Sequence, residues 1–461
     1  MGLPLNFESF GSYVFLKKLA DGGMAEVFLA RPANQAGNGR IQVIKRLLPH
    51  VASSTLFLEM FQTEIQVILG FNHPHVVQLH DFGETEHRPY IAMEYLEGKN
   101  LKEVIAKFIQ KNQWMPVPMA LGLIAQGASG LSYAHTFVNK VTGQPVNAIH
   151  RDISPHNLIV SYEGNLKVID FGIAKAANGN SQEPTTAGTI KGKISYLSPE
   201  QVHGSVIDAR SDVFSLGVVA WELLTLQRPF TKKNDTEVTI ISRINNCDEY
   251  IVPPSYFNSE VPSEVDDVIL KALKKNPDDR YDSAAEFQNA IRKVMIKYFP
   301  NYSYSDTSQM MNFLFEDDIS QERIELKDLN QKAQHFIQSD NDTETQLIES
   351  PGVVTGVFNG LRSVMPESDH IDQRILKIEN MMKENFSRRH YFIFAIYVVS
   401  ILIIKFDPQL SFLNFTKGSK TKTQTSAMTS LASRSVSLRK DTLKTKAPVQ
   451  LKQSFIKGSR K

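Results

Sequence analysis

The sequence predicts an α+β fold in which a strand-rich amino-terminal part precedes a larger helical part. Alternating or apolar patterns predict strands early in the chain, at residues 19–30, 41–45 and 90–98. Apolar helical patterns follow, most clearly at 211–224 and 282–299. With 461 residues, 42% of them hydrophobic and 22% charged, the chain is long enough to enclose a sizeable core.

Three motifs near the middle of the chain predict its chemistry. Residues 150–152 (HRD), Asn157 and residues 170–172 (DFG) place an acid, an amide and a second acid in the order that metal-assisted phosphoryl transfer requires. Asp152 would orient the proton of an attacking hydroxyl. Asn157 would ligate one Mg²⁺, and Asp170 would hold Mg²⁺ bridging the phosphates of ATP. Each triplet can occur by chance, so the prediction depends on the combination.

Two glycines upstream of these motifs predict a turn that binds phosphate. Gly22 and Gly23 lie between Leu19 and Val27, where strand, turn and strand are expected. Glycines let backbone N–H groups approach phosphate oxygens without a side chain in between. An ordinary β-turn is the alternative for this segment.

A lysine and a following helix extend the pattern. Lys45 ends the strand at 41–45 and is expected to contact the α- and β-phosphates. Residues 57–69 carry apolar side chains at helical spacing. Glu64 in that helix is the candidate for an ion pair with Lys45, and Glu59 is the alternative partner. A solvated strand lysine is the simpler interpretation of Lys45 taken alone.

With these motifs, the segments GGMAEVFLA, VIKRLLPH, HRDISPHN and GKISYLSPEQ make residues 10–315 resemble bacterial serine/threonine protein kinases of the eukaryotic (Hanks) type. The resemblance implies a two-lobed protein kinase domain at 10–300, with a small β-rich lobe and a large helical lobe. It implies transfer of the γ-phosphate of ATP to serine or threonine hydroxyls of protein substrates, with Mg²⁺ as the metal and Mn²⁺ as an alternative. A nucleotide-binding pseudokinase scaffold and a small-molecule kinase are the other functions considered.

The resemblance also implies a site for the adenine base at residues 90–98. Backbone groups of Glu94 and Leu96 would hydrogen-bond the base, and Met93 would close the back of the pocket. Leu19, Gly22, Gly23 and Lys45 complete the expected nucleotide contacts. The expected apolar walls are Val27, Ala30, Ile44 and Leu158.

Two further positions resemble structural parts of the large lobe. Asp212 opens the apolar helix at 211–224 and would accept hydrogen bonds from the backbone of residues 150–152. Arg280, in the segment NPDDRY, would pair with Glu200 of the segment SPE. Both relationships are expected to hold the scaffold together.

The sequence departs from the family pattern near the catalytic aspartate and in the glycine loop. Ser154 replaces the usual lysine, and Lys193 follows Gly192 where threonine is usual. We hypothesise that the positive charge has moved, so that Lys193 serves the pocket vacated at Ser154; a surface lysine is the alternative. Ala20 and Ala25 replace two glycines of the usual phosphate loop.

The activation loop is expected to be phosphorylated by the kinase itself. Thr185, Thr186 and Thr189 are the favoured sites, and Ser195 is a further hydroxyl in this region. Arg151 could pair with a phosphate there and order the segment.

The remainder of the chain divides by composition. Residues 301–338 predict a helical extension on the large lobe, and residues 339–387 a linker. Apolar spacing at 371–382 leaves a short stalk and a homodimer as alternatives to plain linker. The single cysteine, Cys247, excludes an intramolecular disulfide and suits a reducing compartment.

A hydrophobic run at residues 391–404 predicts a membrane segment. Its 14 residues fall short of the roughly 17–25 that span a bilayer, but flanking basic side chains can extend the reach. We expect residues 391–406 to form a single transmembrane helix in the inner membrane, with the kinase domain in the cytoplasm. An interfacial or docked helix on a cytoplasmic protein is the alternative.

The last residues, 407–461, predict a disordered basic tail. From residue 405 onward the chain has 13 Lys and Arg against 2 Asp and Glu, although the whole chain carries a net charge of only +2. The tail could bind anionic lipid or envelope polymer outside the cell if the helix spans, or the inner leaflet if it does not. Nucleic-acid binding is not expected, because aromatic residues are sparse in the tail.

Overall fold

The computed structural model describes residues 7–22, 25–33, 40–52, 65, 68–140, 142–171 and 193–349, with side chains to residue 338. The chain divides into two units, Met1–Gln338 and Ser339–Lys461. Every helix and strand that the structure describes belongs to the first unit, apart from the last turns of the helix Glu316–Glu349. Several predicted features lie outside the described residues: Gly23, Glu59, Glu64, Thr185, Thr186, Thr189, the membrane segment 391–406 and the tail 407–461.

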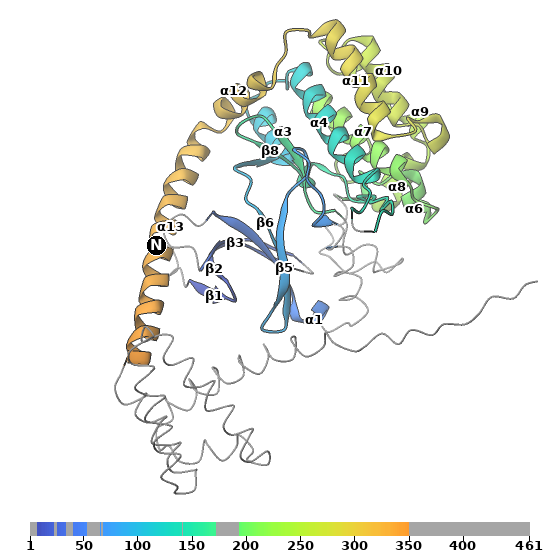
Figure 1. Cartoon of the computed structure of the whole chain (residues 1–461). Helices are drawn as coiled ribbons and strands as arrows, with labels where there is room; N and C mark the ends of the chain where they lie inside the picture. Colours follow the sequence, from blue (N-terminus) through green and yellow to red (C-terminus); the bar gives the residue numbers. More distant parts are fainter. Residues whose placement is uncertain are drawn as a thin grey trace, which may run out of the picture. The chain divides into compact units, whose positions relative to one another are not determined.

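The small lobe is built on one antiparallel sheet with strand order β1-β2-β3-β4-β6-β5 (Figure 1). The strands are β1 (Glu8–Phe10), β2 (Tyr13–Asp21), β3 (Ala25–Pro32), β4 (Gln42–Leu47), β5 (Leu79–Thr85) and β6 (Arg88–Glu94). The short helix α1 (Pro49–Ala52) follows β4. Residues of β6 are buried on both faces, as expected for a strand inside a sheet.

One face of this sheet is held by an aromatic cluster. The rings of Phe15 and Phe28 stack with centroids 4.2 Å apart, and Phe10 packs beside them. The guanidinium of Arg46 lies 4.8 Å from the Phe28 ring centroid and pairs with Glu8 and Glu26. Because Arg46 is buried, this cation–π and ion-pair arrangement satisfies a charge that would otherwise be costly.

The large lobe is mainly helical. Its helices are α3 (Leu101–Gln110), α4 (Val117–His135), α6 (Pro199–His203), α7 (Ala209–Thr225), α8 (Glu237–Asn245), α9 (Cys247–Tyr250), α10 (Ser263–Ala272) and α11 (Ala284–Tyr298). The central helices α4 and α7 are buried on nearly every face, as their continuous apolar sequences predict. At the start of α7, the side chain of Asp208 accepts a hydrogen bond from the backbone N–H of Arg210.

A second, three-stranded sheet packs with the helices of the large lobe and carries the loops of the HRD and DFG motifs. It has the order β7-β8-β9, formed by β7 (Gly98–Asn100), β8 (Leu158–Ser161) and β9 (Leu166–Val168). The hinge segment, residues 94–98, joins β6 of the small lobe to β7. The two-lobed architecture expected from the sequence is therefore confirmed.

Two more helices follow the kinase-like lobes. They are α12 (Tyr304–Leu314) and α13 (Glu316–Glu349). Asn312 on α12 and Tyr162 beside β8 are hydrogen-bonded, so α12 packs on the large lobe as expected. After its first turns, helix α13 lies beside β2 and β3 of the small lobe (Figure 1). The extension therefore contacts the large lobe, as expected, and also the small lobe, and α13 continues to Glu349, where the sequence predicts linker.

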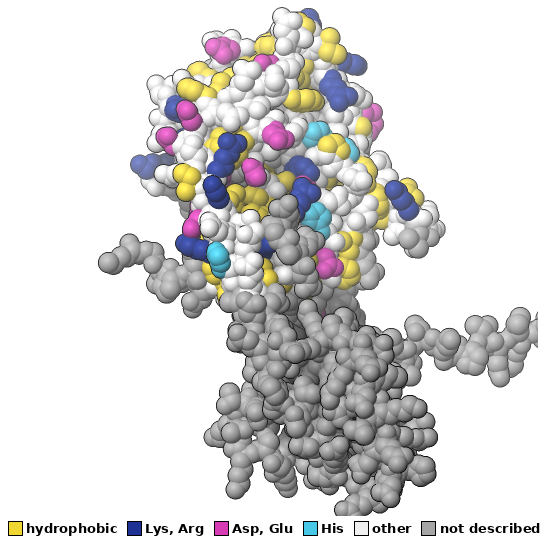
Figure 2. Space-filling model, turned by 60° about the vertical axis from the view of Figure 1, so that its left-hand side comes forward, with side chains coloured by type: hydrophobic (Ala, Val, Ile, Leu, Met, Phe, Trp, Pro, Cys, Tyr) yellow, Lys and Arg dark blue, Asp and Glu magenta, His cyan; other side chains and the backbone are white. Residues whose placement is uncertain are grey.

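On the surface, basic side chains of the described residues are interspersed with acidic ones. Figure 2 shows this mixture on one face, with Lys and Arg in dark blue and Asp and Glu in magenta. Such mixing favours local ion pairs, several of which involve α13. None of the helices formed by the described residues is long and apolar enough to cross a membrane.

Candidate active site

The β8–β9 hairpin brings the two predicted metal ligands together. Asn157 precedes β8 and Asp170 follows β9, and Leu158 pairs with Val168 across the hairpin. The backbone N–H of Ile169 donates to the carbonyl of Asn157 at 2.9 Å. Asn157 and Asp170 are therefore neighbours at the open end of one short hairpin, although 13 positions apart in the sequence.

A lysine of the small lobe reaches this hairpin. Lys45 Nζ on β4 lies 2.8 Å from Asp170 Oδ1, and this ion pair crosses from one lobe to the other. Burial alone would raise the pKa of the Asp170 carboxyl, but the charge and hydrogen bond of Lys45 outweigh it and lower the pKa. Asp170 is therefore ionised at neutral pH, as a metal ligand must be. The predicted partner of Lys45, Glu64, lies outside the described residues.

Asp152 contacts both Asn157 and a residue far along the chain. Asn157 Nδ2 lies 2.8 Å from the carbonyl oxygen of Asp152 and 3.2 Å from its Oδ2. Lys193 Nζ lies 2.9 Å from the same Oδ2. Ser154 is buried beside this loop, and its Oγ has no hydrogen-bond partner among the described residues. If the positive charge has moved from position 154 to Lys193, Lys193 must contact this loop, and it does. The contribution of Lys193 to turnover stays a prediction.

Asp212 fixes the backbone of the catalytic loop. Its carboxylate accepts hydrogen bonds from the N–H groups of His150 at 2.8 Å and Arg151 at 2.9 Å. His135 Nε2 lies 2.8 Å from the same carboxylate. This confirms the role expected for Asp212. Arg151 has φ +64°, a conformation that costs energy for a non-glycine residue, and these bonds help to hold it.

The histidine of the HRD motif ties the two motifs together. His150 is fully buried, and its Nε2 lies 2.9 Å from the carbonyl oxygen of Ile169, just before Asp170. Its ring centroid lies 4.8 Å from that of Phe171. Asp170 itself has φ +57°. The DFG aspartate is thus held in a strained backbone conformation by packing and hydrogen bonds of its neighbours.

The inner face of the small-lobe sheet supplies the expected walls of a nucleotide pocket. Val27 pairs with Lys45 across β3 and β4, and Val43 pairs with Met93 across β4 and β6. Side chains alternate along a strand, so Val43 and Lys45 share a face and Ile44 points the other way. Val43, which we did not predict, is therefore the apolar residue beside Lys45.

Two of the predicted walls are wrong. Ile44 and Ala30 are completely buried in the aromatic cluster on the opposite face of the sheet. The remaining predicted wall, Leu158, is also fully buried. It belongs to the main hydrophobic core, which also contains Met93, and not to the aromatic cluster. The error has a simple cause: an alternating strand places neighbouring residues on opposite faces, and the lysine already marks the inner one.

The hinge has one backbone donor already in use. The N–H of Glu94 donates to the carbonyl of Gln78 at 3.0 Å, so a contact from Glu94 to adenine would come from its carbonyl. The Glu94 carboxylate accepts from Lys167 Nζ at 2.6 Å and from the N–H of Gln78 at 2.7 Å. This side chain therefore braces the hinge against β9. Leu96, the other predicted hinge contact, follows in the same segment.

The structure shows the beginning of the predicted phosphate turn. Leu19 near the end of β2 is 45% exposed. Gly22 N donates to the carbonyl of Ala25 at 3.0 Å, which narrows the turn between β2 and β3. Lys18 pairs with Asp21 and Glu26 on the two strands that flank the turn. Gly22 is thus placed in the loop that faces the nucleotide in the predicted arrangement.

The donor set fits magnesium held jointly by protein and phosphate. Asn157 directs its Nδ2 group toward Asp152, so its Oδ1 is the atom left to ligate a cation, and Asp170 provides an ionised carboxylate. Within the part of the chain that the structure describes, no three His, Cys, Asp or Glu side chains form a metal cluster. The pair of Asn157 and Asp170 suits Mg²⁺, which commonly uses one or two carboxylates together with substrate phosphates and water.

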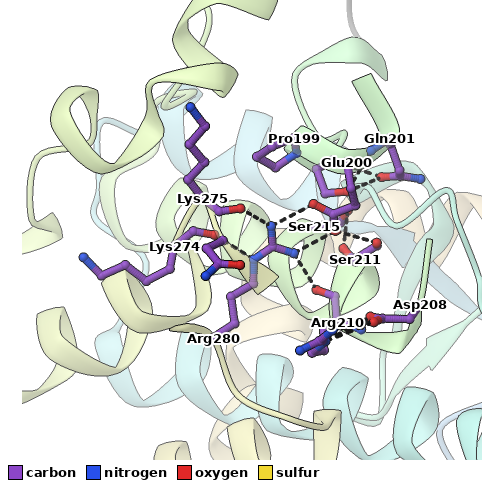
Figure 3. Close-up of polar contacts among 12 residues, drawn as sticks. Pro199, Glu200, Gln201, Asp208, Arg210, Ser211, Ser215, Lys274, Lys275 and Arg280 are labelled. Atoms are coloured by element: carbon purple, nitrogen blue, oxygen red, sulfur yellow. Dashed lines mark hydrogen bonds and ion pairs between the residues drawn. The ribbon is translucent and has the colours of Figure 1, made fainter. Parts of the chain in front are cut away.

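A buried ion pair secures the segment that precedes α7 (Figure 3). Arg280 NH1 and NH2 each lie 2.8 Å from a carboxylate oxygen of Glu200, so the predicted pair is confirmed as bidentate. Ser211 Oγ donates to Glu200 at 2.5 Å, and Arg280 also donates to the carbonyls of Lys274 and Lys275. Nearly every polar atom of this buried pair is therefore satisfied.

Comparison with known proteins agrees with this geometry. The protein kinase domain model matches residues 13–292. The chain is 39% identical over 297 residues to tyrosine-protein kinase MasK of Myxococcus xanthus, covering 64% of this chain and 45% of that protein. It is 36% identical over 280 residues to serine/threonine-protein kinase PknB of Mycolicibacterium smegmatis, covering 60% and 42%.

The similarity is confined to part of each relative. The chain spans less than half the length of these curated relatives. Among solved structures, the PknI kinase domain of Mycobacterium tuberculosis aligns with a TM-score of 0.47 at 26% identity, over 64% of this chain and 99% of that one. The family model, at residues 13–292, covers the two lobes and the hinge.

Proposed function

Because this chain belongs to the protein kinase domain family, we propose that it is a protein kinase that transfers the γ-phosphate of ATP to serine or threonine hydroxyls of proteins. The observation that carries the proposal is the convergence of Lys45, Asp152, Asn157 and Asp170 on one hairpin and its neighbouring loop. Intact catalytic and metal positions argue against the alternative of a pseudokinase scaffold.

Each of these residues has a separate task in the proposed reaction. Asp152 orients the acceptor hydroxyl and takes up its proton, and Lys45 neutralises phosphate charge. Asn157 and Asp170 would hold Mg²⁺, which supplies electrostatic stabilisation of the transferring phosphoryl group. Mn²⁺ offers the same oxygen-ligand chemistry. Glu64 remains the proposed partner of Lys45 in the nucleotide-bound state.

The adenine base would lie between the hinge and the inner face of the sheet. The carbonyl of Glu94 and the backbone of Leu96 would bind its polar edge, while Val27, Val43 and Met93 enclose its faces. Leu19, Gly22 and Gly23 would close over the phosphates.

Lys193 supplies a positive charge beside the catalytic aspartate. Its 2.9 Å contact with Asp152 supports the proposal that it stabilises the transferring phosphoryl group in place of the lysine absent at Ser154. Activation-loop phosphorylation at Thr185, Thr186 or Thr189 is proposed as the switch that orders this segment.

Tyrosine is the second acceptor to consider. The relative with 39% identity carries the name of a tyrosine-protein kinase, whereas several others carry that of serine/threonine-protein kinases. The exchanges at Ser154 and Lys193 alter the surroundings of the acceptor hydroxyl. We therefore rank serine/threonine first and leave tyrosine as the direct competitor.

The carboxyl-terminal part of the chain suggests where the protein lies in the cell. Residues 391–406 would anchor the chain in the inner membrane as a single span, with the two lobes in the cytoplasm and the basic tail at 407–461. A cytoplasmic protein with an interfacial helix remains the alternative. Residues 339–387 would link the lobes to this anchor and allow a homodimer.

The proposed function is tested by incubating the full chain with γ-labelled ATP and Mg²⁺, followed by phosphoamino-acid analysis. Label on phosphoserine or phosphothreonine is expected, and mass spectrometry should locate part of it at 185–189. Label found only on phosphotyrosine would mean that tyrosine, and not serine or threonine, is the acceptor. Absence of label, both on the chain and on added general protein substrates, would contradict kinase activity.

A further inference from the structure

Helix α13 is attached to the large lobe through its first turns. Asp318 Oδ2 pairs with Lys107 Nζ of α3 at 3.0 Å, and Glu322 Oε1 pairs with Lys99 Nζ of β7 at 2.5 Å. Tyr162 donates from its hydroxyl to the other oxygen of Glu322 at 2.9 Å. Glu322 therefore binds β7 and the residue that follows β8 at the same time, and its side chain is only 30% exposed.

The next turns of the same helix are attached to the small lobe. Glu325 Oε1 pairs with Lys17 Nζ of β2 at 2.6 Å, and Arg31 of β3 donates to the side-chain oxygen of Asn330 at 2.7 Å. An apolar contact lies between these polar ones. Its buried members are Leu16, Leu29, Leu329 and Ala333.

The change from one lobe to the other occurs beside the hinge. Glu322 binds the large lobe and Glu325, less than one helical turn later, binds the small lobe. Tyr95 of the hinge segment packs against the apolar contact. Burial, together with the carboxylates of Glu322 and Glu97, raises the pKa of Tyr95 to about 12, so that this hinge side chain stays neutral.

We propose that α13 is a second connection between the lobes and positions them for nucleotide binding. The hinge segment is a single stretch of backbone, and closure of the two lobes requires rotation about such a segment. A helix bound to both sides of it restricts that rotation. With α13 bound to both lobes, Lys45 Nζ of the small lobe lies 2.8 Å from Asp170 Oδ1 of the large lobe. The inference deepens the proposed function and rests on it.

The contacts divide into a part that fixes the helix and a part that can be tuned. Leu329 and Ala333 are almost completely buried, so they hold α13 on the small lobe irrespective of charge. Lys17 and Glu325 are 42% and 47% exposed, and an exposed pair contributes little by attraction alone. A like-charge pair at these two positions repels α13 from the small lobe. Charge reversal is therefore a more informative change than removal of the pair.

The test uses the full chain with a charge reversal, its rescue and a matched control. Glu325→Lys places a lysine opposite Lys17, and Lys17→Glu with Glu325→Lys restores an opposite-charge pair. Asp328→Lys makes the same charge change at a residue whose pair, with Lys332 at 2.6 Å, stays within the exposed side of α13. Thermal unfolding verifies that each variant is folded, and Leu329→Ala takes the place of Glu325→Lys if that variant does not fold.

Two quantities are measured for each protein. One is the Kd of a non-hydrolysable ATP analogue with Mg²⁺, and the other is the amide hydrogen-exchange rate of residues 94–98 without nucleotide. Glu325→Lys should weaken nucleotide binding by about fivefold and speed exchange at the hinge, because the competent arrangement becomes less populated. The rescue should return both to within about twofold of the wild type, and Asp328→Lys should leave both unchanged.

The kinetic counterpart separates positioning from chemistry. The KM for ATP should rise in Glu325→Lys while kcat changes less, since no atom of Glu325 touches the reacting groups. Wild-type Kd and exchange rates in Glu325→Lys, or equal changes in Asp328→Lys, would overturn the inference. A wild type that binds no nucleotide would contradict the proposed function instead, and the exchange rates would still decide whether α13 restrains the hinge.

Discussion

Lys193 Nζ and Asp152 Oδ2 lie 2.9 Å apart, so the residue that replaces a threonine in the family pattern directly contacts the proposed catalytic aspartate. The position that usually carries the positive charge is Ser154, whose hydroxyl is buried without a hydrogen-bond partner among the described residues. One exchange removes a cation from the catalytic loop, and the other returns one from a neighbouring segment. Ser154 and Lys193 are 39 positions apart, and the fold brings Lys193 to the loop that contains Ser154, as the hypothesis of a moved charge requires.

Lys193→Ala should lower kcat by about a hundredfold, because a cation positioned at the transferring phosphoryl group stabilises the transition state. Nucleotide affinity and the midpoint of unfolding should change little, since Lys193 is 44% exposed. Steady-state kinetics with ATP and a protein substrate measure the effect. Lys193→Arg is the control that keeps the charge, and it should retain more activity than Lys193→Ala. Turnover near wild type in Lys193→Ala would reduce Lys193 to a surface residue.

Arg280→Ala should lower the free energy of unfolding by about 3–5 kcal/mol, because it leaves the buried carboxylate of Glu200 without its ion-pair partner. Urea denaturation gives this free energy from the midpoint and slope. Lys332→Ala serves as the control, since the Lys332–Asp328 pair is exposed and should contribute at most about 0.5 kcal/mol. Similar losses in the two variants would contradict the assignment of Arg280 as a structural centre.

The same pair predicts how stability depends on pH. Burial alone would raise the pKa of the Glu200 carboxyl, but hydrogen bonds from Arg280 and Ser211 outweigh it and lower the pKa from 4.5 to about 2. A depressed carboxyl pKa stabilises the folded state above the unfolded-state pKa, and this contribution is lost as the pH falls. Glu200 should therefore contribute up to about 3 kcal/mol at neutral pH, lost progressively from about pH 5 toward pH 2.

Unfolding free energies measured at intervals between pH 5 and 3 test this dependence. The double variant Glu200→Gln with Arg280→Met removes both charges together and should show a shallower decline over that interval. Replacement of both partners avoids the unpaired charge that a single substitution would leave. A decline as steep as that of the wild type would show that other carboxylates, not Glu200, dominate acid unfolding.

Gly98→Ala should lower the free energy of unfolding by about 1–3 kcal/mol and disturb the hinge, because the added methyl would collide with β8. A Cβ at this position would lie 2.2 Å from the carbonyl oxygen of Val160 and 2.6 Å from the Cα of Ser161. Gly127→Ala on α4 is the matched control, since its Cβ would meet no atom closer than 3.4 Å. That change should be neutral or slightly stabilising, because alanine favours helix. Urea denaturation compares the two, and an unchanged stability in Gly98→Ala would contradict the steric argument.

Much of the site could be predicted because its residues occur at characteristic spacings. Asp152, Asn157 and Asp170 lie in short loops flanking one hairpin, so their order along the chain nearly determines their proximity. Lys45 and the Glu200–Arg280 pair required the family resemblance, since nothing local joins residues 80 positions apart. The same resemblance supplied Asp212, whose buried carboxylate needs the hydrogen-bond partners that the backbone of His150 and Arg151 provides.

Other features were missed for physical reasons that the sequence only partly reveals. Ile44 was mistaken for a pocket wall, although strand alternation from Lys45 already selects Val43. The path of α13 could not be predicted, because its partners Lys17, Lys99 and Lys107 resemble ordinary solvated lysines. Their acidic partners lie more than 200 positions away, and only the fold brings them to one helix.

The most direct test of the account compares phosphoryl transfer and nucleotide binding in the wild type and Asp152→Asn. If Asp152 accepts the proton of the attacking hydroxyl, label transfer from γ-labelled ATP should fall by about 10²–10⁴-fold, while the Kd for Mg-bound nucleotide changes little. Transfer in Asp152→Asn at the wild-type rate, or a wild type that neither binds Mg-bound nucleotide nor labels any hydroxyl, would contradict the account.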